Sequence, residues 1–459
     1  MDMIALYQFL YGLFFIAVVP VFLFFFSAKV EVPFRGFQSQ GIGGLVTAIG
    51  LLIMFRGMWE IYIVGKGHPM NAFPPKKLVT TGIYGIFPHP IYFGFCMGVL
   101  GVSIALGSAT GLWLTTPLTA LGCIALSVGY EDLYLKRTFG TLPRPLLSYR
   151  GILSPFFGVI GLRTLWEKAI QLSQILANSW SAKQIGRFRI INHFLYSALA
   201  GGLGAYLVIM WTGRAELVTT GTLIFVGLVG AALFGQLMLV SRNGLSRPFG
   251  YFGSLLGIGI AGLILSFYNQ NTSVILAAFS LAAPWVQGIG RLRCLVQGCC
   301  HGAQTEAEKG IIVTNPHSRV CSLGNLQGIP IHPTQLYSIL GNTCLGLVLI
   351  GWWKSGAGSS LIIGLYLFGS GVLRFLEESR RGEPMTPIIA KLRIYQWYSV
   401  FMVVLGMGMM LINESKSPIW HGGDWLQAVS AGILFFFVTG LFMSTDFPNS
   451  NRRFSRLSG

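Results

Sequence analysis

The sequence predicts an all-α polytopic membrane protein with about 12 transmembrane helices, arranged as modules of four and eight. Of the 459 residues, 53% are hydrophobic and only 10% are charged, whereas soluble domains carry about 25% charged residues. Apolar runs of about 17–25 residues, each long enough to cross a bilayer as a helix, recur along the chain. The runs are 5–26, 42–64, 84–107, 111–130, 191–211, 219–240, 249–268, 273–290, 335–351, 361–376, 394–412 and 425–443.

The positive charge of the chain predicts how it is oriented in the membrane. The formal net charge is +17, and Lys and Arg favour cytoplasmic loops. Segment 131–190 holds nine of them and is the longest polar segment. We therefore expect a multi-pass protein of a bacterial-type inner membrane, with both termini cytoplasmic and no nucleic-acid partner. The run at 5–26 lacks a basic leader and a small-x-small site, so we expect a span rather than a signal peptide.

The long polar segment also sets the predicted domain organisation. We expect a first membrane domain over 1–150 and an interfacial amphipathic linker over 151–190. A second membrane domain follows over 191–443, and a basic tail covers 444–459.

Two segments of the first module have an unusual polar pattern. GKGHPMNAFPPKKLVTTGIYGIFPHPIYFG (65–94) ends with His89 at the start of a span, and YEDLYLKRTFGTL (130–142) places Glu131 and Asp132 at a helix end. A carboxylate there can bind amino or ribose hydroxyl groups, and a histidine can carry a proton. The alternative is that His89 is simply a residue at a helix end and that Glu131 and Asp132 are solvated surface charges.

These two segments resemble the isoprenylcysteine carboxyl methyltransferase and phospholipid methyltransferase superfamily, over roughly residues 40–157. The resemblance implies S-adenosylmethionine bound from the cytoplasm. The matching positions, which would bind this cofactor, are Gly82, Tyr84, His89, Tyr92 and Glu131. Pro88 stands where the family usually has arginine, and Pro143 where a tyrosine often follows Phe-Gly, so we expect a weakened or altered cofactor site. A methyltransferase-like shell without activity is the alternative.

Three polar clusters mark the second module. They are GRLRCLVQGCCHG (290–302), HPTQLY (332–337) and RFLEESRR (374–381). Ionisable residues at the ends of spans are costly to place and usually functional. Arg374 and Glu378 are four residues apart, so they share a helical face and can form an ion pair. Because arginine binds phosphate with two hydrogen bonds, the clusters predict a pocket for a phospholipid headgroup.

The cysteines of the second module also raise the possibility of a metal site. The residues that offer zinc ligands are Cys294, Cys299, Cys300, His301, Cys321 and His332. The C-x4-C-C-H spacing is not that of a standard zinc knuckle, however, and the flanking arginines disfavour a cation. We therefore predict no metal. A disulfide and plain packing of the sulfurs also stay open.

In this order, the three clusters resemble the prolipoprotein diacylglyceryl transferase family, over roughly residues 190–412. The resemblance implies transfer of a diacylglyceryl unit from phosphatidylglycerol to a nucleophile such as a protein cysteine thiol or a small molecule, with no cofactor for this module. Arg291 would bind the donor phosphate. The predicted catalytic residues are Arg291, Tyr337, Arg374, Glu378 and His332, and the predicted substrate-binding residues are Arg293, Gln335 and His301.

The sequence departs from this family at two points. Phe252 stands where the family has a histidine that is a proposed base, so we expect His332, or else His301, to replace it. Family members work on the outer face of the membrane in which they lie. The charge pattern here predicts instead that both pockets face the cytoplasm, and we expect them to act on a common lipid. Two further readings stay open, a methyltransferase whose second module only binds lipid and a non-catalytic lipid-binding or transport protein.

Overall fold

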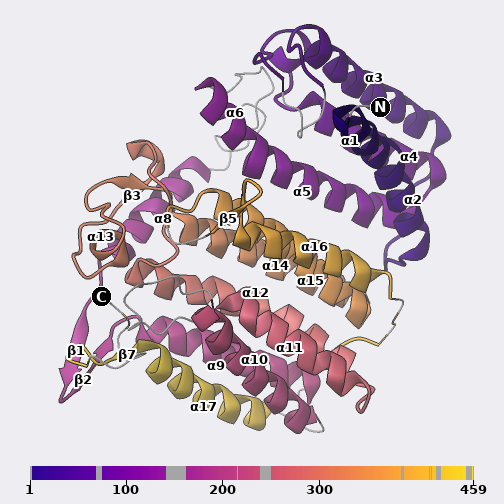
Figure 1. The fold of residues 1–459 in the computed structure, drawn as a ribbon. Coiled ribbons are helices and arrows are strands. Elements are labelled where there is room, and N and C mark those ends of the chain that lie inside the picture. Colours follow the sequence, from indigo (N-terminus) through magenta and orange to yellow (C-terminus); the bar gives the residue numbers. More distant parts are fainter. Residues whose placement is uncertain are drawn as a thin grey trace. The chain divides into compact units, whose positions relative to one another are not determined.

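A computed structural model of the chain divides it into two compact units, Met1–Thr164 and Leu165–Gly459. The structure describes residues 3–68, 75–140, 162–213, 216–237, 250–383, 387–412, 414, 416–419, 425–450 and 457. Residues 141–161, which include the start of the predicted linker, and half of the predicted basic tail lie outside these residues. Each unit is described by itself (Figure 1).

The first unit contains four apolar helical stretches. The first runs through α1 (Met3–Leu13), a π-helical turn (Phe14–Val18) and α2 (Val19–Lys29). The second is α3 (Gln40–Ile63), the third α4 (Pro90–Leu106), and a 3-10 turn at Gly82–Gly85 lies between them. The last joins α5 (Thr116–Leu126) to α6 (Asp132–Phe139), through π-helical turns at Gly111–Thr115 and Ser127–Glu131.

Glycines let α3 and α4 approach each other closely. Gly43 and Gly50 lie two turns apart on one face of α3, and a Cβ on either would come within 2.8 Å of the α4 backbone at Gly101 or Gly94. Small residues of this kind allow backbone-to-backbone packing where lipid supplies no hydrophobic driving force. The helices α3 and α4 are therefore closely packed, and the polar residues 75–89 lie in the connection between them.

The second unit is a bundle of eight apolar helices that run roughly along a common axis (Figure 1). They are α9 (Phe194–Thr212), α10 (Leu217–Leu237), α11 (Tyr251–Ser266), α12 (Thr272–Gln297), α14 (Thr334–Lys354), α15 (Ser359–Ser379), α16 (Ile394–Met410) and α17 (Trp425–Ser444). The amphipathic helix α8 (Leu162–Ala177) precedes the bundle.

Small elements close one end of this bundle. Strands β1 (Ala182–Ile185), β2 (Phe188–Ile191) and β7 (Thr445–Asp446) form one antiparallel sheet. The remaining short elements, which lie in the loops between helices, are a 3-10 turn (Ala307–Lys309), β3 (Ile311–Ile312), α13 (Arg319–Ser322), β4 (Pro330–Ile331), β5 (Ile388–Ile389) and β6 (Leu392–Arg393).

The helix α8 packs on this closed end. Ala177 is buried in a cluster with Leu295 and Ile311, whereas Leu172 and Ile175 are exposed. An amphipathic helix with such an exposed apolar face suits the membrane interface. The four-part domain division and the interfacial role of 151–190 stay predictions.

The described residues confirm the predicted fold class. Nine helices are long and apolar enough to cross a membrane, and Pro90–Leu106, Tyr251–Ser266 and Ile394–Met410 are shorter apolar helices. Each of these twelve corresponds to one predicted span, four in the first unit and eight in the second. The chain is thus a polytopic all-α membrane protein.

Candidate functional site

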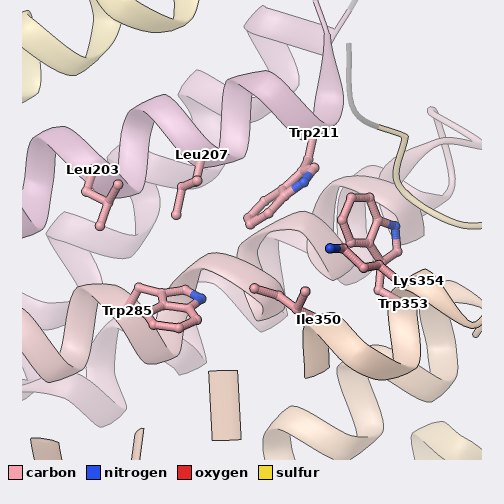
Figure 2. A pocket seen from close by; sticks show the side chains of 7 residues that line it. All are labelled: Leu203, Leu207, Trp211, Trp285, Ile350, Trp353 and Lys354. Carbon is pink, nitrogen blue, oxygen red and sulfur yellow. The ribbon is translucent and has the colours of Figure 1, made fainter. Parts of the chain in front are cut away.

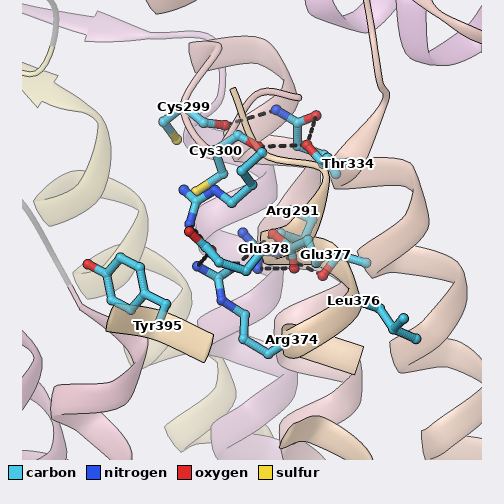
Figure 3. A network of polar contacts seen from close by, with 12 residues as sticks. Arg291, Cys299, Cys300, Thr334, Arg374, Leu376, Glu377, Glu378 and Tyr395 are labelled. Carbon is cyan, nitrogen blue, oxygen red and sulfur yellow. Dashed lines mark hydrogen bonds and ion pairs between the residues drawn. The ribbon is translucent and has the colours of Figure 1, made fainter. Parts of the chain in front are cut away.

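Arg291 lies on α12, two turns before that helix ends, and connects three helices. Its Nε donates a hydrogen bond to Ser338 Oγ on α14 at 2.9 Å, and its Nη2 donates to Glu377 Oε2 on α15 at 2.8 Å. The Arg291 side chain is 16% exposed. The two contacts therefore hold its guanidinium group in a fixed position (Figure 3).

Arg374 pairs with two successive carboxylates on its own helix. Its Nη1 lies 2.7 Å from Glu377 Oε1 and its Nη2 lies 3.0 Å from Glu378 Oε2. The second contact confirms the ion pair predicted from the four-residue spacing. Because an unpaired carboxylate is costly to bury, the fully buried Glu378 requires these cations around it.

Two further arginines extend the network towards the loop after α15. Arg381 Nη1 lies 2.8 Å from Glu378 Oε2, and its Nη2 lies 2.6 Å from Glu383 Oε2. Arg393 Nη1 approaches Glu378 Oε1 at 3.9 Å. We call the seven residues the arginine cluster; they are Arg291, Arg374, Arg381, Arg393, Glu377, Glu378 and Glu383. Four guanidinium groups thus face three carboxylates, which leaves one positive charge in excess.

Aromatic rings form one wall of the arginine cluster. The guanidinium carbon of Arg374 lies 5.4 Å from the ring centroid of Tyr395 and 5.9 Å from that of Phe252. The Phe252 ring stacks on Tyr395, with centroids 5.5 Å apart. Phe252, which replaces the family's histidine, therefore supplies a cation–π surface at this position instead of a base.

The loop after α12 also borders the arginine cluster. Gly298 and Cys300 both have positive φ, 75° and 60°, so the chain turns sharply there. The Cys300 backbone N–H donates to Glu383 Oε1 at 2.6 Å. Thr334 Oγ1 donates to the Cys300 carbonyl at 2.7 Å, and Gln335 Nε2 donates to the Cys299 carbonyl at 2.9 Å. The start of α14 thereby fixes the loop against the arginine cluster (Figure 3).

His332 and Tyr337 form a second polar pair near the start of α14. His332 Nδ1 lies 3.2 Å from the Tyr337 hydroxyl. Trp166 of α8 stacks on Tyr337, with ring centroids 6.1 Å apart and planes 12° apart. The helix α8 thus covers a residue that the sequence predicts to be catalytic.

The predicted substrate-binding residues take different positions. Arg293 donates to the Met443 carbonyl on α17 at 3.1 Å, away from the arginine cluster. His301 is 3% exposed, and its Nδ1 lies 3.1 Å from the Gly302 carbonyl oxygen. Gln335 is 2% exposed and holds the loop described above. Their roles in substrate binding stay predictions.

Three cysteine sulfurs lie next to the arginine cluster. The Sγ atoms of Cys294, Cys299 and Cys300 all lie within 4.8 Å of one another. This group does not include Cys321, whose Sγ donates to the Val313 carbonyl at 3.5 Å. Three sulfurs are a suitable donor set for a soft metal ion, and the absence of a metal here stays a prediction.

In the first unit, His89 lies between two acids at the start of α4. Its Nδ1 lies 3.3 Å from Glu131 Oε2 and its Nε2 lies 3.0 Å from Asp132 Oδ1. Burial alone would lower the pKa of His89, but the hydrogen bonds to Asp132 and Glu131 and their charges outweigh it and raise the pKa to about 9. His89 is therefore positively charged at neutral pH.

The turn at Gly82 completes this group. Glu60 is 5% exposed and accepts a hydrogen bond from the Ile83 backbone N–H at 2.9 Å and one from Arg56 Nε at 2.9 Å. Gly82 has a φ of 60°, and a side chain there would collide with the Glu60 carboxylate. Tyr84 is buried, which raises its pKa, as do the charges of Glu131 and Glu60.

The remaining predicted cofactor residue also lies in this group. The ring centroids of His89 and Tyr92 are 5.9 Å apart. Gly82, Tyr84, His89, Tyr92 and Glu131 thus come from one loop and the ends of two helical stretches within the first unit.

Sequence reasoning missed several members of the arginine cluster and its surroundings. These are Ser338, Glu383, Arg393 and Tyr395. Ser338 follows Thr334 by one helical turn, so it could have been placed on the same face. Glu383 lies in the loop after α15, and Arg393 and Tyr395 lie at the start of α16; the sequence carries no local signal that would join them to Arg374.

Two family models match the chain. Residues 234–412 match the family model of prolipoprotein diacylglyceryl transferase, and residues 39–141 match that of phospholipid methyltransferase.

Curated relatives named as prolipoprotein diacylglyceryl transferases also match the chain. The phosphatidylglycerol–prolipoprotein diacylglyceryl transferase of Clostridium tetani is 28% identical over 206 residues, which are 42% of this chain and 79% of the relative. Transferase 2 of Clostridium perfringens is 29% identical over 36% of this chain and 62% of its own length. The enzyme of Polynucleobacter asymbioticus is 26% identical over 42% of this chain and 78% of its own length. This chain is a bacterial-type, multi-pass inner-membrane protein that joins a region similar to phospholipid methyltransferases to a region similar to prolipoprotein diacylglyceryl transferases.

Proposed function

We propose that the second unit transfers a diacylglyceryl group from phosphatidylglycerol to a nucleophilic acceptor, a protein cysteine thiol or a small molecule. Both similarities agree on a lipid-modifying membrane transferase. The observation that carries the proposal is the arginine cluster, in which Arg291 and Arg374 share one carboxylate at the end of a membrane-spanning bundle.

Charge balance supports a phosphodiester as the ligand. The cluster has four guanidinium groups and three carboxylates. One phosphodiester carries a single negative charge, which the excess positive charge of the cluster matches. Arg291 is partly exposed and can donate two parallel hydrogen bonds to phosphate oxygens when it leaves Glu377. Arg374 then keeps Glu377 and Glu378 paired.

The cluster also suits the chemistry of the leaving group. The acceptor sulfur forms a bond to the terminal glyceryl carbon, the bond from that carbon to the phosphate oxygen breaks, and glycerol phosphate departs with the electron pair. The phosphate gains negative charge in this step, because a diester becomes a monoester. Guanidinium groups that bind the phosphate stabilise this developing charge.

A base must take the proton of the thiol, since the thiolate is the nucleophile. We propose His332 for this role. Its Nδ1 lies 3.2 Å from the Tyr337 hydroxyl, which can orient the ring. His301 is less suitable because it is 3% exposed and lies against the Gly302 carbonyl.

The test uses the full-length protein in vesicles that contain phosphatidylglycerol with a labelled headgroup. Arg291→Ala is expected to lower the release of glycerol phosphate by about 100-fold, and Arg291→Lys to restore only part of it. Lys391→Gln removes an exposed cation from the turn between β5 and β6 and is the charge control. Unchanged release in Arg291→Ala would overturn the proposal. No release by the unaltered protein would favour a lipid-binding or transport protein.

We propose that the first unit contains a second transferase site, which binds S-adenosylmethionine. Glu131 Oε2 is buried and faces His89 Nδ1, and Glu131 and Asp132 are each about a quarter exposed. Such carboxylates suit the amino and hydroxyl groups of this cofactor. When bound, S-adenosylmethionine supplies an activated methyl group. Tyr84, His89 and Tyr92 would shape the site, and Gly82 would keep its loop close to Glu60.

Binding of labelled S-adenosylmethionine tests this second proposal. Glu131→Gln is expected to weaken binding at least about tenfold, because it removes a charged hydrogen-bond acceptor. Glu216→Gln, in the second unit, is the matched control. Equal binding by Glu131→Gln and the unaltered protein would contradict the assignment. The release of glycerol phosphate in the same samples reports on the second unit separately.

We further propose that both termini and both pockets face the cytoplasm. The charge pattern supports this orientation, with nine Lys and Arg in 131–190. Single cysteines introduced at 131–140 and 303–310, in a background without accessible cysteines, would be labelled from one side only. Labelling of the two segments from opposite sides would reject the proposal.

A further inference from the structure

The second unit contains a cavity that takes no part in the arginine cluster. It has a volume of about 590 Å³ and lies between α9, α12 and α14. Its lining is Leu203, Leu207 and Trp211 from α9, Trp285 from α12, and Ile350, Trp353 and Lys354 from α14 (Figure 2). This volume is in the range of ligand-binding pockets.

The cavity runs from the middle of the bundle, at Trp285 and Gly346, to the end of α14 that is opposite Arg291. Arg291 contacts Ser338, in the first turn and a half of α14, whereas Lys354 is the last residue of that helix. Sixteen residues of α helix span about 24 Å, at about 1.5 Å a residue. The hydrocarbon core of a bilayer is about 30 Å thick. Lys354 therefore lies near the other membrane interface.

Ring packing and a hydrogen bond fix the tryptophan side chains that line the cavity. The rings of Trp211 and Trp353 meet edge to face, with centroids 5.7 Å apart. Trp353 Nε1 donates to the Pro418 carbonyl at 2.7 Å. Trp285 packs over Gly346, where a Cβ would come within 2.8 Å of the indole ring. Trp211 and Trp353 lie at the ends of α9 and α14, and tryptophans at such positions are typical of the membrane–water interface.

The lining has one charged group and no acidic one. Lys354 is exposed, and Figure 2 shows its ammonium group reaching toward the cavity beside Trp211 and Ile350. The other six lining side chains are apolar or aromatic. A ligand that fits has a long apolar part and an anionic group at its outer end.

We propose that this cavity binds an acyl chain of an anionic phospholipid from the leaflet opposite the arginine cluster, with the lipid phosphate against Lys354. The wall of leucines and tryptophans receives the chain, and the ammonium selects the headgroup charge. The phosphate of a lipid held here lies about 24 Å along the bundle from Arg291, at about 1.5 Å a residue, which is too far for the lipid to be the donor of the transferred group. It is a second lipid site, which anchors α9, α12 and α14 at the far interface.

Tryptophan fluorescence of the full-length protein tests the site, with brominated acyl chains as quenchers. Vesicles contain either brominated phosphatidylglycerol or brominated phosphatidylcholine. The unaltered protein is expected to show stronger quenching by phosphatidylglycerol, and Trp211→Phe to lose part of that quenching. Because one lysine near the surface contributes roughly a fivefold preference for anionic lipid, Lys354→Ala is expected to remove a preference of that size.

Two controls make the result specific. Lys354→Arg keeps the charge and is expected to keep the preference. Lys416→Ala removes an exposed cation that does not line the cavity, and it is expected to change nothing. Equal quenching by the two lipids in the unaltered protein would overturn the proposal. The proposal would also be overturned if Lys354→Ala kept the preference for phosphatidylglycerol. The same holds if Lys416→Ala reduced this preference as much as Lys354→Ala does.

Discussion

Arg291 and Arg374 donate to opposite oxygens of a single carboxylate, that of Glu377, at 2.8 and 2.7 Å. The two arginines come from different helices, so this carboxylate links α12 to α15. Glu377 therefore holds the two guanidinium groups in fixed positions relative to each other.

Glu377→Ala is expected to destabilise the second unit. It leaves Arg291 and Arg374 with fewer partners in a mostly buried site, and breaking a buried ion pair costs about 3 kcal/mol or more. Thermal unfolding of the purified protein measures the change. Glu306→Ala removes an exposed carboxylate and is the control. A change in the free energy of unfolding equal to that of the control would show that the shared carboxylate is not structural.

Tyr337→Phe is expected to lower the rate of diacylglyceryl transfer about tenfold and to shift its pH profile. The change removes the hydroxyl group that lies 3.2 Å from His332 Nδ1, and a histidine's pKa and ring orientation depend on such a partner. Glycerol phosphate release as a function of pH measures both effects. Tyr268→Phe, at a position 85% exposed, is the control. A lower rate with an unchanged pH profile would contradict the role of Tyr337 in positioning His332.

The stability of the first unit is expected to fall as the pH rises from about 6.5 to about 9. The pKa of His89 is about 9 in the folded protein, whereas the ordinary value for a histidine is 6.5. The folded state therefore binds more protons in this window, and the stabilisation, on the order of 3 kcal/mol, is complete below pH 6.5 and is lost above pH 9. Unfolding of the unaltered protein and of His89→Gln, measured from pH 6 to 10, checks this. The two curves should converge at high pH, and parallel curves would refute the ion-pair origin.

Gly82→Ala is expected to destabilise the protein more than Gly140→Ala. Both glycines have positive φ, 60° and 74°, so alanine costs about 1 kcal/mol at either position. A Cβ at Gly82 also collides with the Glu60 carboxylate, whereas a Cβ at Gly140 has nothing within 4 Å. Thermal unfolding and S-adenosylmethionine binding are the measurements. Equal effects of the two substitutions would mean that the Glu60 contact can relax.

Much of the fold follows from the sequence because lipid imposes a simple rule on it. Each apolar run of sufficient length became a helix, since backbone groups in lipid must pair within one segment. The Arg374–Glu378 pair was also predictable, because it lies within one helix. Local patterns carry this kind of information well.

Contacts between distant segments did not follow from the sequence. Arg291 contacts Ser338 across 47 positions, and Glu383 contacts Cys300 across 83. Arg291 and Arg293 look equivalent in sequence, but residues two apart point to different helix faces, and only Arg291 joins the arginine cluster. Such pairings depend on how the helices pack, which hydrophobic periodicity does not specify.

The contact between Trp166 and Tyr337 has a practical consequence for dissecting the protein. A fragment that starts at residue 191, where the second membrane domain was expected to begin, would lack the indole that covers the phenol and the apolar side chains that seal Leu295 and Ile311. Such a truncation would expose an apolar surface and remove packing contacts next to His332. Expression of the C-terminal half in isolation should therefore start ahead of Leu162.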